Sequence, residues 1–304
     1  MSKLVTLAEA IEKFVPDGAS VAMGTALEAA IPFAAGHEII RQNRRNLTLV
    51  GPISDILFDQ LIGAGCVARV KAAWVGNVSA GLGHNYRRAV EQNRPQPLAV
   101  DDYSNFTLTL ALQAGAQGSP YVATRSIEGS DILEKSAVFL KGVSPFDGLP
   151  VALIPALRPD VTILHVQRTD EEGNAHLWGN LGVSEEAALS AQRVILTAEE
   201  IVSHEVITSD PNRVIVPGFK VAAVVHQPAG CHPSPLPGYY NRDHTFFTEY
   251  HRASRQAEDF STWLTEWVTG LSDHAAYLEK LGKDRLEALR PTEKALAAPV
   301  DYGT

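Results

Sequence analysis

The stretch ASVAMGTALEAAIPFAAGHEIIRQNRRNLTLVG, residues 19–51, decides the fold. A short apolar run at 19–24 ends in glycine, a helical pattern follows at 31–44, and a second apolar run occupies 46–51. Short apolar runs bounded by glycine are typical of buried strands. A strand, a helix and another strand in this order form the unit from which parallel sheets are built.

The same alternation continues along the chain. Further strands are predicted at 67–76, 120–126, 151–157, 160–167, 193–203, 213–218 and 221–228. Helices are predicted at 6–15, 55–65, 85–93, 105–118 and 184–192, with a long helical region at 247–271. Residues 127–150 are expected to be irregular. We therefore expect an open, mostly parallel α/β sheet with helices on both faces, in a single domain of residues 1–282 followed by a loose tail, 283–304.

Composition and charge exclude several classes of function. The 304 residues are 45% hydrophobic and 20% charged, with a net charge of -9, which is typical of a globular protein and unfavourable for binding nucleic acid or an anionic membrane. We expect no signal peptide, and the sequence has no run near the ~20 apolar residues of a membrane span. With only two cysteines, a disulfide framework is not expected, and a cytoplasmic location fits.

Ligands of parallel sheets bind beyond the carboxyl ends of the strands, so the loops at those ends hold the candidate residues. The loop at 23–32 follows a strand that ends at Gly24 and leads into a helix N-terminus, which favours anions. The loop at 75–84 is rich in glycine and offers Asn77, Ser79 and Gly81, with backbone amides that we expect to be free to donate. A flexible connection is the competing interpretation.

Two further loops contain polar side chains. In the segment VDDYSN, residues 100–105, Ser104 and Asn105 are candidates for substrate binding, although either could simply cap the following helix. Arg125 could bind a carboxylate through two of its guanidinium nitrogens, or form a surface ion pair. Asp102 in the same segment and Glu28 in the first loop are the candidate catalytic carboxylates.

These motifs together resemble a known family. The runs GNVSAGLGHNYRRAVEQ (76–92), VDDYSNFTLTLALQAGAQGSPYVATRS (100–126) and HVQRTDEEGNAHLWG (165–179) are similar to the A (α) subunit of family I coenzyme A transferases, and within that family to the glutaconate CoA-transferase group. Nearly the whole chain takes part in the resemblance. The CoA-dependent ring-cleaving hydrolases of steroid catabolism share the same plan, and sugar-phosphate isomerases have a related fold.

The resemblance implies a heteromeric enzyme of A (α) and B (β) subunits, as A2B2 or A4B4, with the active site between them. A glutamate of the B subunit would attack the acyl-CoA, and CoA would pass through a glutamyl-CoA thioester to a carboxylic acid. Amides of a glycine loop would stabilise the oxyanion. Coenzyme A is then a substrate, and no tightly bound cofactor is expected. The alternatives are a hydrolase subunit, or a non-catalytic one that completes the partner's pocket.

The acidic turn in HVQRTDEEGNAHLWG needs its own explanation. The resemblance makes Glu172-Gly173-Asn174 a structural turn, in which Gly173 and Asn174 adopt left-handed conformations and Asp170 faces solvent. His165 and His176 flank the turn, but their spacing does not match a metal motif. No metal site is expected.

Overall fold

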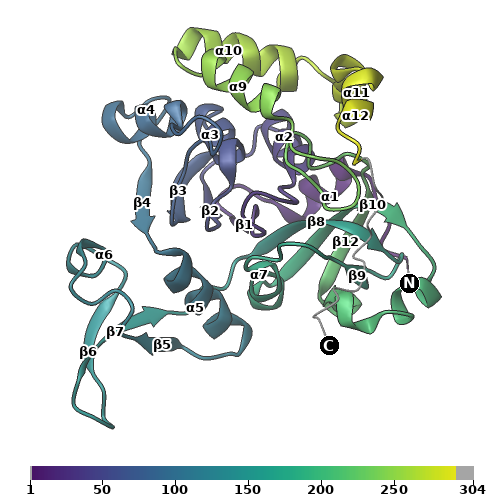
Figure 1. Ribbon diagram of the computed structural model, residues 1–304. Coiled ribbons are helices and arrows are strands. Elements are labelled where there is room, and N and C mark those ends of the chain that lie inside the picture. The colour runs from purple at the N-terminus through teal and green to yellow at the C-terminus, as the bar shows by residue number, and fades with distance from the viewer. Residues whose placement is uncertain (1, 292–304) are drawn as a thin grey trace, which may run out of the picture.

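A computed structural model describes residues 2–291 and shows two β-sheets of very different size (Figure 1). The larger sheet has nine strands and the smaller has three. Seven strands of the larger sheet are parallel, in the spatial order β12-β10-β8-β1-β2-β3-β4. Their bounds are β1 (Ser20–Ala22), β2 (Leu47–Val50), β3 (Val67–Ala72), β4 (Ala99–Asp102), β8 (Val161–Thr169), β10 (Arg193–Ile201) and β12 (Val221–His226). The predicted parallel fold is confirmed.

The strand order reverses direction at β1. The chain begins in the middle of the sheet, adds β2, β3 and β4 on one side, and later returns to place β8 on the other side of β1. Val21 accordingly pairs with Leu49 of β2 and with Val161 of β8. A reversal of this kind opens a crevice at the carboxyl ends of the strands, which is where ligands bind in open α/β sheets.

Helices cover both faces of the large sheet, as the sequence predicts. On one face, Val21 and Leu49 pack in a large apolar core, and on the other, Ala22 and Val50 pack against Leu108. This alternation follows from the two-residue period of a strand. The first core is covered by α1 (Leu7–Phe14), α2 (Phe33–Arg41), α3 (Asp55–Gly63), α4 (His84–Gln92), α9 (His244–Ala253), α10 (Ala257–Leu264) and α11 (His274–Leu281). The opposite face is covered by α5 (Asn105–Ala116) and α7 (Ser184–Ser190).

The smaller sheet stands beside the large one (Figure 1). It is antiparallel, in the order β5-β7-β6, with bounds β5 (Tyr121–Thr124), β6 (Leu140–Val143) and β7 (Pro150–Pro155). The prediction that 127–150 is irregular is therefore wrong for β6 and for the short helix α6 (Asp131–Glu134). The strand LKGV is largely exposed, and within residues 2–291 it pairs with β7 alone. An exposed edge strand of this kind does not show the apolar run that marks a buried strand.

Short elements complete the described chain. They are β9 (Ala175–His176), β11 (Val214–Val216), α8 (His204–Thr208), the 3₁₀ turns Pro211–Arg213 and Gly218–Lys220, the π-helical turn Thr265–Thr269, and α12 (Lys283–Ala288). Because α12 is helical and its Arg285 bonds Asp243, the loose tail predicted at 283–304 is wrong for its first residues. Residues 292–304 of that prediction lie outside the described part. Within residues 2–291, no helix is both long and apolar enough to cross a membrane.

Candidate active site

The loops that follow β1 and β2 are locked together at the carboxyl edge of the sheet. Gly24 lies two residues after the end of β1 and has a φ of +66°, and the Ser54 hydroxyl donates a 3.0 Å hydrogen bond to the carbonyl of Met23 beside it. A Cβ at residue 24 would overlap the side chain of Ser54. Glycine is therefore required here both by the backbone conformation and by the close approach of the neighbouring loop.

Asp55, the first residue of α3, is buried in an unusual backbone conformation. Its φ is +46°, which costs energy for a residue with a side chain and is often found at functional sites. Its carboxylate accepts a 3.1 Å hydrogen bond from the amide of Val78 and a 2.6 Å hydrogen bond from Nη2 of Arg242. Burial raises the pKa of Asp55, although the Arg242 guanidinium opposes that shift.

Three strand-end loops converge on the guanidinium of Arg242. Its Nη2 reaches Asp55 after β2, and its Nε and Nη2 donate to the Ser79 hydroxyl after β3 at 3.2 and 3.0 Å. Its Nη1 lies 4.0 Å from the carboxylate of Glu28 after β1. The guanidinium also lies 3.6 Å from the ring centroid of Phe247, a cation–π contact that fixes its plane. The predicted residues Glu28 and Ser79 are thus brought to one point.

The glycine-rich loop after β3 uses its polar groups internally. Asn77 is buried, donates to the carbonyl of Phe247 at 2.8 Å and accepts from the amide of Ser79 at 3.0 Å. The amide of Val78 is held by Asp55, and those of Ala80 and Gly81 by the carbonyl of Asn77. The expectation that this loop offers free amides is therefore wrong for these residues. The side chain of Asn77 ties the loop to α9.

The other predicted residues belong to β4, to α5 and to the small sheet. Ser104 caps α5 through a capping box with Thr107, and Asn105 is the first residue of that helix. Asp102 is the last residue of β4 and is exposed. Arg125 follows β5 of the small sheet, where its exposed side chain pairs with Glu128 at 3.4 Å. Ser104 therefore caps a helix and Arg125 forms a surface ion pair, which are the alternative roles that the sequence left open for them.

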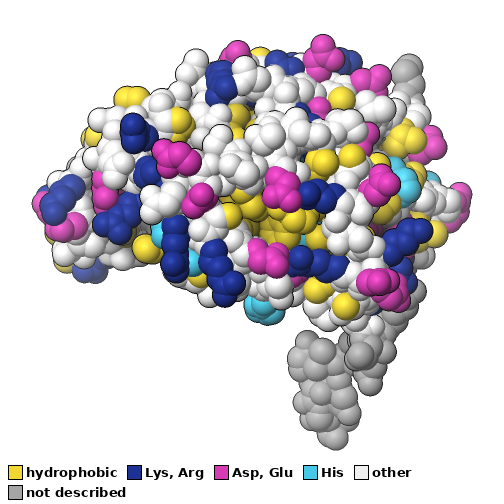
Figure 2. Space-filling view, turned by 90° about the horizontal axis from the view of Figure 1, so that it is seen from above, with side chains coloured by type: hydrophobic (Ala, Val, Ile, Leu, Met, Phe, Trp, Pro, Cys, Tyr) yellow, Lys and Arg dark blue, Asp and Glu magenta, His cyan; other side chains and the backbone are white. Residues whose placement is uncertain are grey.

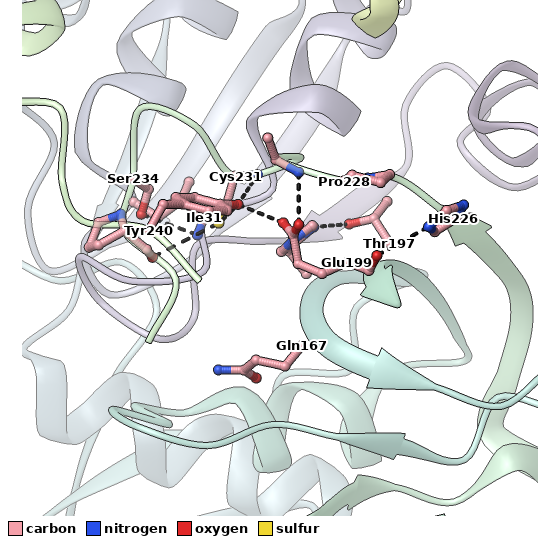
Figure 3. Close-up of polar contacts among 12 residues, drawn as sticks. Ile31, Gln167, Thr197, Glu199, His226, Pro228, Cys231, Ser234 and Tyr240 are labelled. Atoms are coloured by element: carbon pink, nitrogen blue, oxygen red, sulfur yellow. Dashed lines mark hydrogen bonds and ion pairs between the residues drawn. The ribbon is translucent and has the colours of Figure 1, made fainter. Parts of the chain in front are cut away.

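A second group of buried polar side chains lies between β8, β10 and the segment that follows β12 (Figure 3). The carboxylate of Glu199 lies 2.8 Å from Nε2 of His165 and accepts bonds from the amide of Ala229 and the phenol of Tyr240 at 2.9 and 2.7 Å. Burial alone raises the pKa of Glu199, but the contacts with His165 and the other donors outweigh it and hold the pKa below its usual value. The same phenol lies 2.9 Å from the Cys231 thiol.

Comparison with known proteins identifies the family to which this chain belongs. A family model described as Coenzyme A transferase matches residues 4–227. The chain belongs to the coenzyme A transferase family. The resemblance noted in the sequence is confirmed.

This coenzyme A transferase chain is similar, over nearly its whole length, to the A subunits of two bacterial enzymes. The A subunit of the 3-oxoadipate CoA-transferase from Pseudomonas knackmussii is 41% identical over 286 residues, which are 94% of this chain and 100% of that protein. The A subunit of the glutaconate CoA-transferase from Acidaminococcus fermentans is 33% identical over 306 residues, with 95% of each chain covered. The crystal structure of the latter transferase superimposes with a TM-score of 0.91 over 95% of this chain and 96% of that one, at 32% identity.

The transferase chain has two site residues that sequence reasoning missed. Asp55 is the first residue of α3, the helix that follows β2, and the strand-end rule finds it when the rule is applied to every central strand. Arg242 comes from the segment GYYNRDHTFF, far from any strand end. Only the tertiary fold places it against Asp55.

The acidic turn of the transferase chain is built differently from the prediction. Gly173 has a φ of +89°, as expected, but Asn174 does not have a positive φ. Asp170 is buried rather than solvated, because it accepts bonds from two backbone amides and from the side chains of Asn174 and His204. The hydrogen bonds to the Asp170 side chain close the turn, so a second residue in the left-handed conformation is not needed. Among residues 2–291, no group of three or more His, Cys, Asp or Glu is placed to hold a metal ion.

Proposed function

We propose that this chain is the A subunit of a heteromeric CoA-transferase, which moves CoA from an acyl-CoA to a carboxylic acid. One observation carries the proposal: the buried carboxylate at the candidate edge, Asp55, is clamped by Arg242 at 2.6 Å and is not poised to attack a thioester. The similarity to two A subunits over more than nine-tenths of the chain points the same way. The nucleophile then belongs to a partner.

The proposed chemistry needs a glutamate of a B subunit. Its carboxylate attacks the thioester carbonyl, forms a mixed anhydride and releases the CoA thiolate. The thiolate attacks the glutamyl carbonyl, which forms a glutamyl-CoA thioester and releases the first acid as its carboxylate. A second carboxylate repeats these steps in reverse and leaves as the new acyl-CoA, while the glutamate is regenerated. CoA is thus a substrate, and no other cofactor is required.

The role of this chain is to form one wall of the shared cleft. The loops after β1 and β3 present Glu28 and Ser79, and the segment before α9 presents Arg242, at the edge where the sheet reversal opens the crevice. Residues 1–282 are proposed to act as one domain, in an A2B2 or A4B4 assembly in the cytoplasm. On the face that Figure 2 shows, basic and acidic side chains are interspersed, which suits a small-molecule enzyme better than a nucleic-acid binder.

A role in a hydrolase is the second candidate. The cholesterol ring-cleaving hydrolase IpdA subunit of Mycobacterium tuberculosis is 27% identical over 84% of this chain, a weaker likeness than that to the two transferases. In a hydrolase, water would replace the acceptor acid and a carboxylate of this chain, such as the exposed Asp102, would take part. A non-catalytic role in completing the partner's pocket needs neither Asp102 nor Glu28.

One reconstitution separates these functions. The chain is co-expressed and co-purified with a B-type subunit, and CoA exchange is measured between two carboxylic acids. Exchange by the complex, but by neither chain alone, and its loss after hydroxylamine or borohydride treatment in the presence of acyl-CoA, is the expected result. Release of free CoA without an acceptor acid would favour the hydrolase. Exchange by the isolated chain would overturn the two-subunit proposal.

A further inference from the structure

We propose that Arg242 binds the second, non-reacting carboxylate of a dicarboxylic acid substrate. This inference rests on the proposed transferase function and names the class of acid that the enzyme takes. It starts from an unpaired donor. The side chain of Arg242 is only 9% exposed, and its Nη1 is buried and has no hydrogen-bond partner within residues 2–291.

The remaining nitrogens of the guanidinium are already used. Nη2 donates to Asp55 and Ser79, and Nε donates to Ser79. The cation–π contact with Phe247 holds the group in one plane. Because these contacts hold the guanidinium in one orientation, the N–H groups of Nη1 point in a fixed direction. Buried N–H groups are rarely left without an acceptor, so the free Nη1 points to a missing acceptor.

Glu28 shows what kind of group fits that position. Its Oε2 lies 4.0 Å from Nη1, too far for a hydrogen bond, and its side chain is 53% exposed. The carboxylate of Glu28 therefore faces Nη1 without a hydrogen bond to it, from a side chain that is partly open to solvent. A carboxylate of the substrate would take the place of the Glu28 carboxylate and accept hydrogen bonds from the unused N–H groups of Nη1.

The surrounding charges favour a carboxylate over a phosphate of CoA. Asp55 already balances the charge of Arg242, and Glu28 adds a second negative charge nearby. A dianionic phosphate would meet net repulsion, whereas one carboxylate exchanges for Glu28 at nearly constant charge. The same two acids would disfavour the oxyanion that forms at the reacting carbonyl. The group at Arg242 is therefore the carboxylate remote from the reaction.

The test uses the co-expressed two-subunit enzyme and paired acceptor acids. Glutarate and adipate are compared with pentanoate and hexanoate, which have the same chain lengths but lack the second carboxylate, with one acyl-CoA donor throughout. The variants are Arg242→Lys, which keeps the charge, and the double variant Arg242→Gln/Asp55→Asn, which leaves no unpaired buried carboxylate. Arg213→Gln is the matched control, because Arg213 also pairs with an aspartate and lies over an aromatic ring.

We expect the double variant to raise the KM for the dicarboxylic acids at least tenfold more than it raises the KM for the monocarboxylic acids. Arg242→Lys should give an intermediate rise, Glu28→Gln should lower the KM for the dicarboxylic acids, and Arg213→Gln should change neither. Equal losses for both kinds of acid, no change in either, or a wild-type enzyme that prefers monocarboxylic acids would overturn the inference while leaving the transferase function intact. Absence of exchange with every acid would instead count against the proposed function.

Discussion

Arg242 and Asp55 are 187 residues apart in the sequence, yet their side chains meet at 2.6 Å in the structure. This ion pair joins the loop that follows β2 to the segment that precedes α9. Its aspartate side chain is fully buried and its arginine side chain is 9% exposed. The pair therefore fixes the geometry of the candidate edge as well as its charge.

Removing Arg242 should destabilise the protein strongly. Arg242→Ala leaves the buried carboxylate of Asp55 without its counter-ion, and we expect the free energy of unfolding to fall by ~3–5 kcal/mol. Urea denaturation measures this change. The double variant Arg242→Ala/Asp55→Asn should recover part of the loss, because no uncompensated charge remains. Arg213→Ala, which breaks a more exposed ion pair, should cost ~1 kcal/mol or less; a similar cost for both arginines would contradict this assignment.

Glu199 should stabilise the chain in a pH-dependent way. Its folded pKa lies below the usual 4.5, so its contribution is present above that pH and is lost as the pH falls through the lowered pKa. We expect Glu199→Gln to lower the free energy of unfolding at pH 7 by ~2 kcal/mol, because hydrogen bonds to a charged acceptor are replaced by weaker ones. The difference between wild type and variant should shrink in acid. A difference that is constant with pH would show that the charge of Glu199 is not involved.

His37 should make the protein sensitive to mild acid. Burial, with the nearby Arg41, lowers its folded pKa from 6.5 to about 3, while its Nε2 lies 3.0 Å from Oε1 of Gln60. Above pH 6.5 both folded and unfolded chains hold it neutral, so its full contribution is present there. Below that pH the unfolded chain takes up a proton first, and stability falls by up to about 1.4 kcal/mol per pH unit.

His37→Gln tests this assignment. The variant should flatten the fall of the free energy of unfolding between about pH 6 and the lowest pH at which the protein stays folded. His274, whose pKa burial lowers to about 4, contributes a slope of the same sign and will remain in the variant. An unchanged slope would mean that His37 is not the titrating group.

Adding a side chain at Gly24 should destabilise the protein. Gly24→Ala places a Cβ against Ser54 in a left-handed conformation, and we expect a loss of ~1–3 kcal/mol in the free energy of unfolding. Gly18→Ala is the matched control, because Gly18 also has a positive φ, of +80°, but has open space around it. The excess loss in Gly24→Ala over Gly18→Ala measures the overlap with Ser54, and equal losses would refute it.

The fold could be predicted because its signals are local. The apolar runs of β1 and β2 and the capping box of Thr6 and Glu9 are complete within short windows of sequence. The strand-end rule then led to Gly24, Glu28 and Ser79, which the structure places at one edge. The exposed strand β6 has no such local signal, since it lies at the edge of the small sheet and, in the described part of the chain, pairs with β7 alone.

The centre of the candidate site could not be predicted in this way. Arg242 and Asp55 carry no motif, and their partnership depends on the return of the chain across the sheet from β12 to α9. Asn77 and Ser104 were expected to bind substrate, yet the structure gives each a hydrogen-bonding role within the chain. A polar residue at a strand end can form hydrogen bonds with neighbouring residues or with a ligand, and the sequence does not distinguish the two.

The location of the covalent CoA adduct tests the two-subunit mechanism most directly. The assembled enzyme is incubated with acyl-CoA alone, and both chains are then weighed by intact-protein mass spectrometry, with borohydride reduction and peptide mapping to find the modified residue. We expect a CoA thioester on a glutamate of the partner and none on this chain. A CoA thioester on a carboxylate of this chain, such as Glu28 or Asp102, would contradict the proposal.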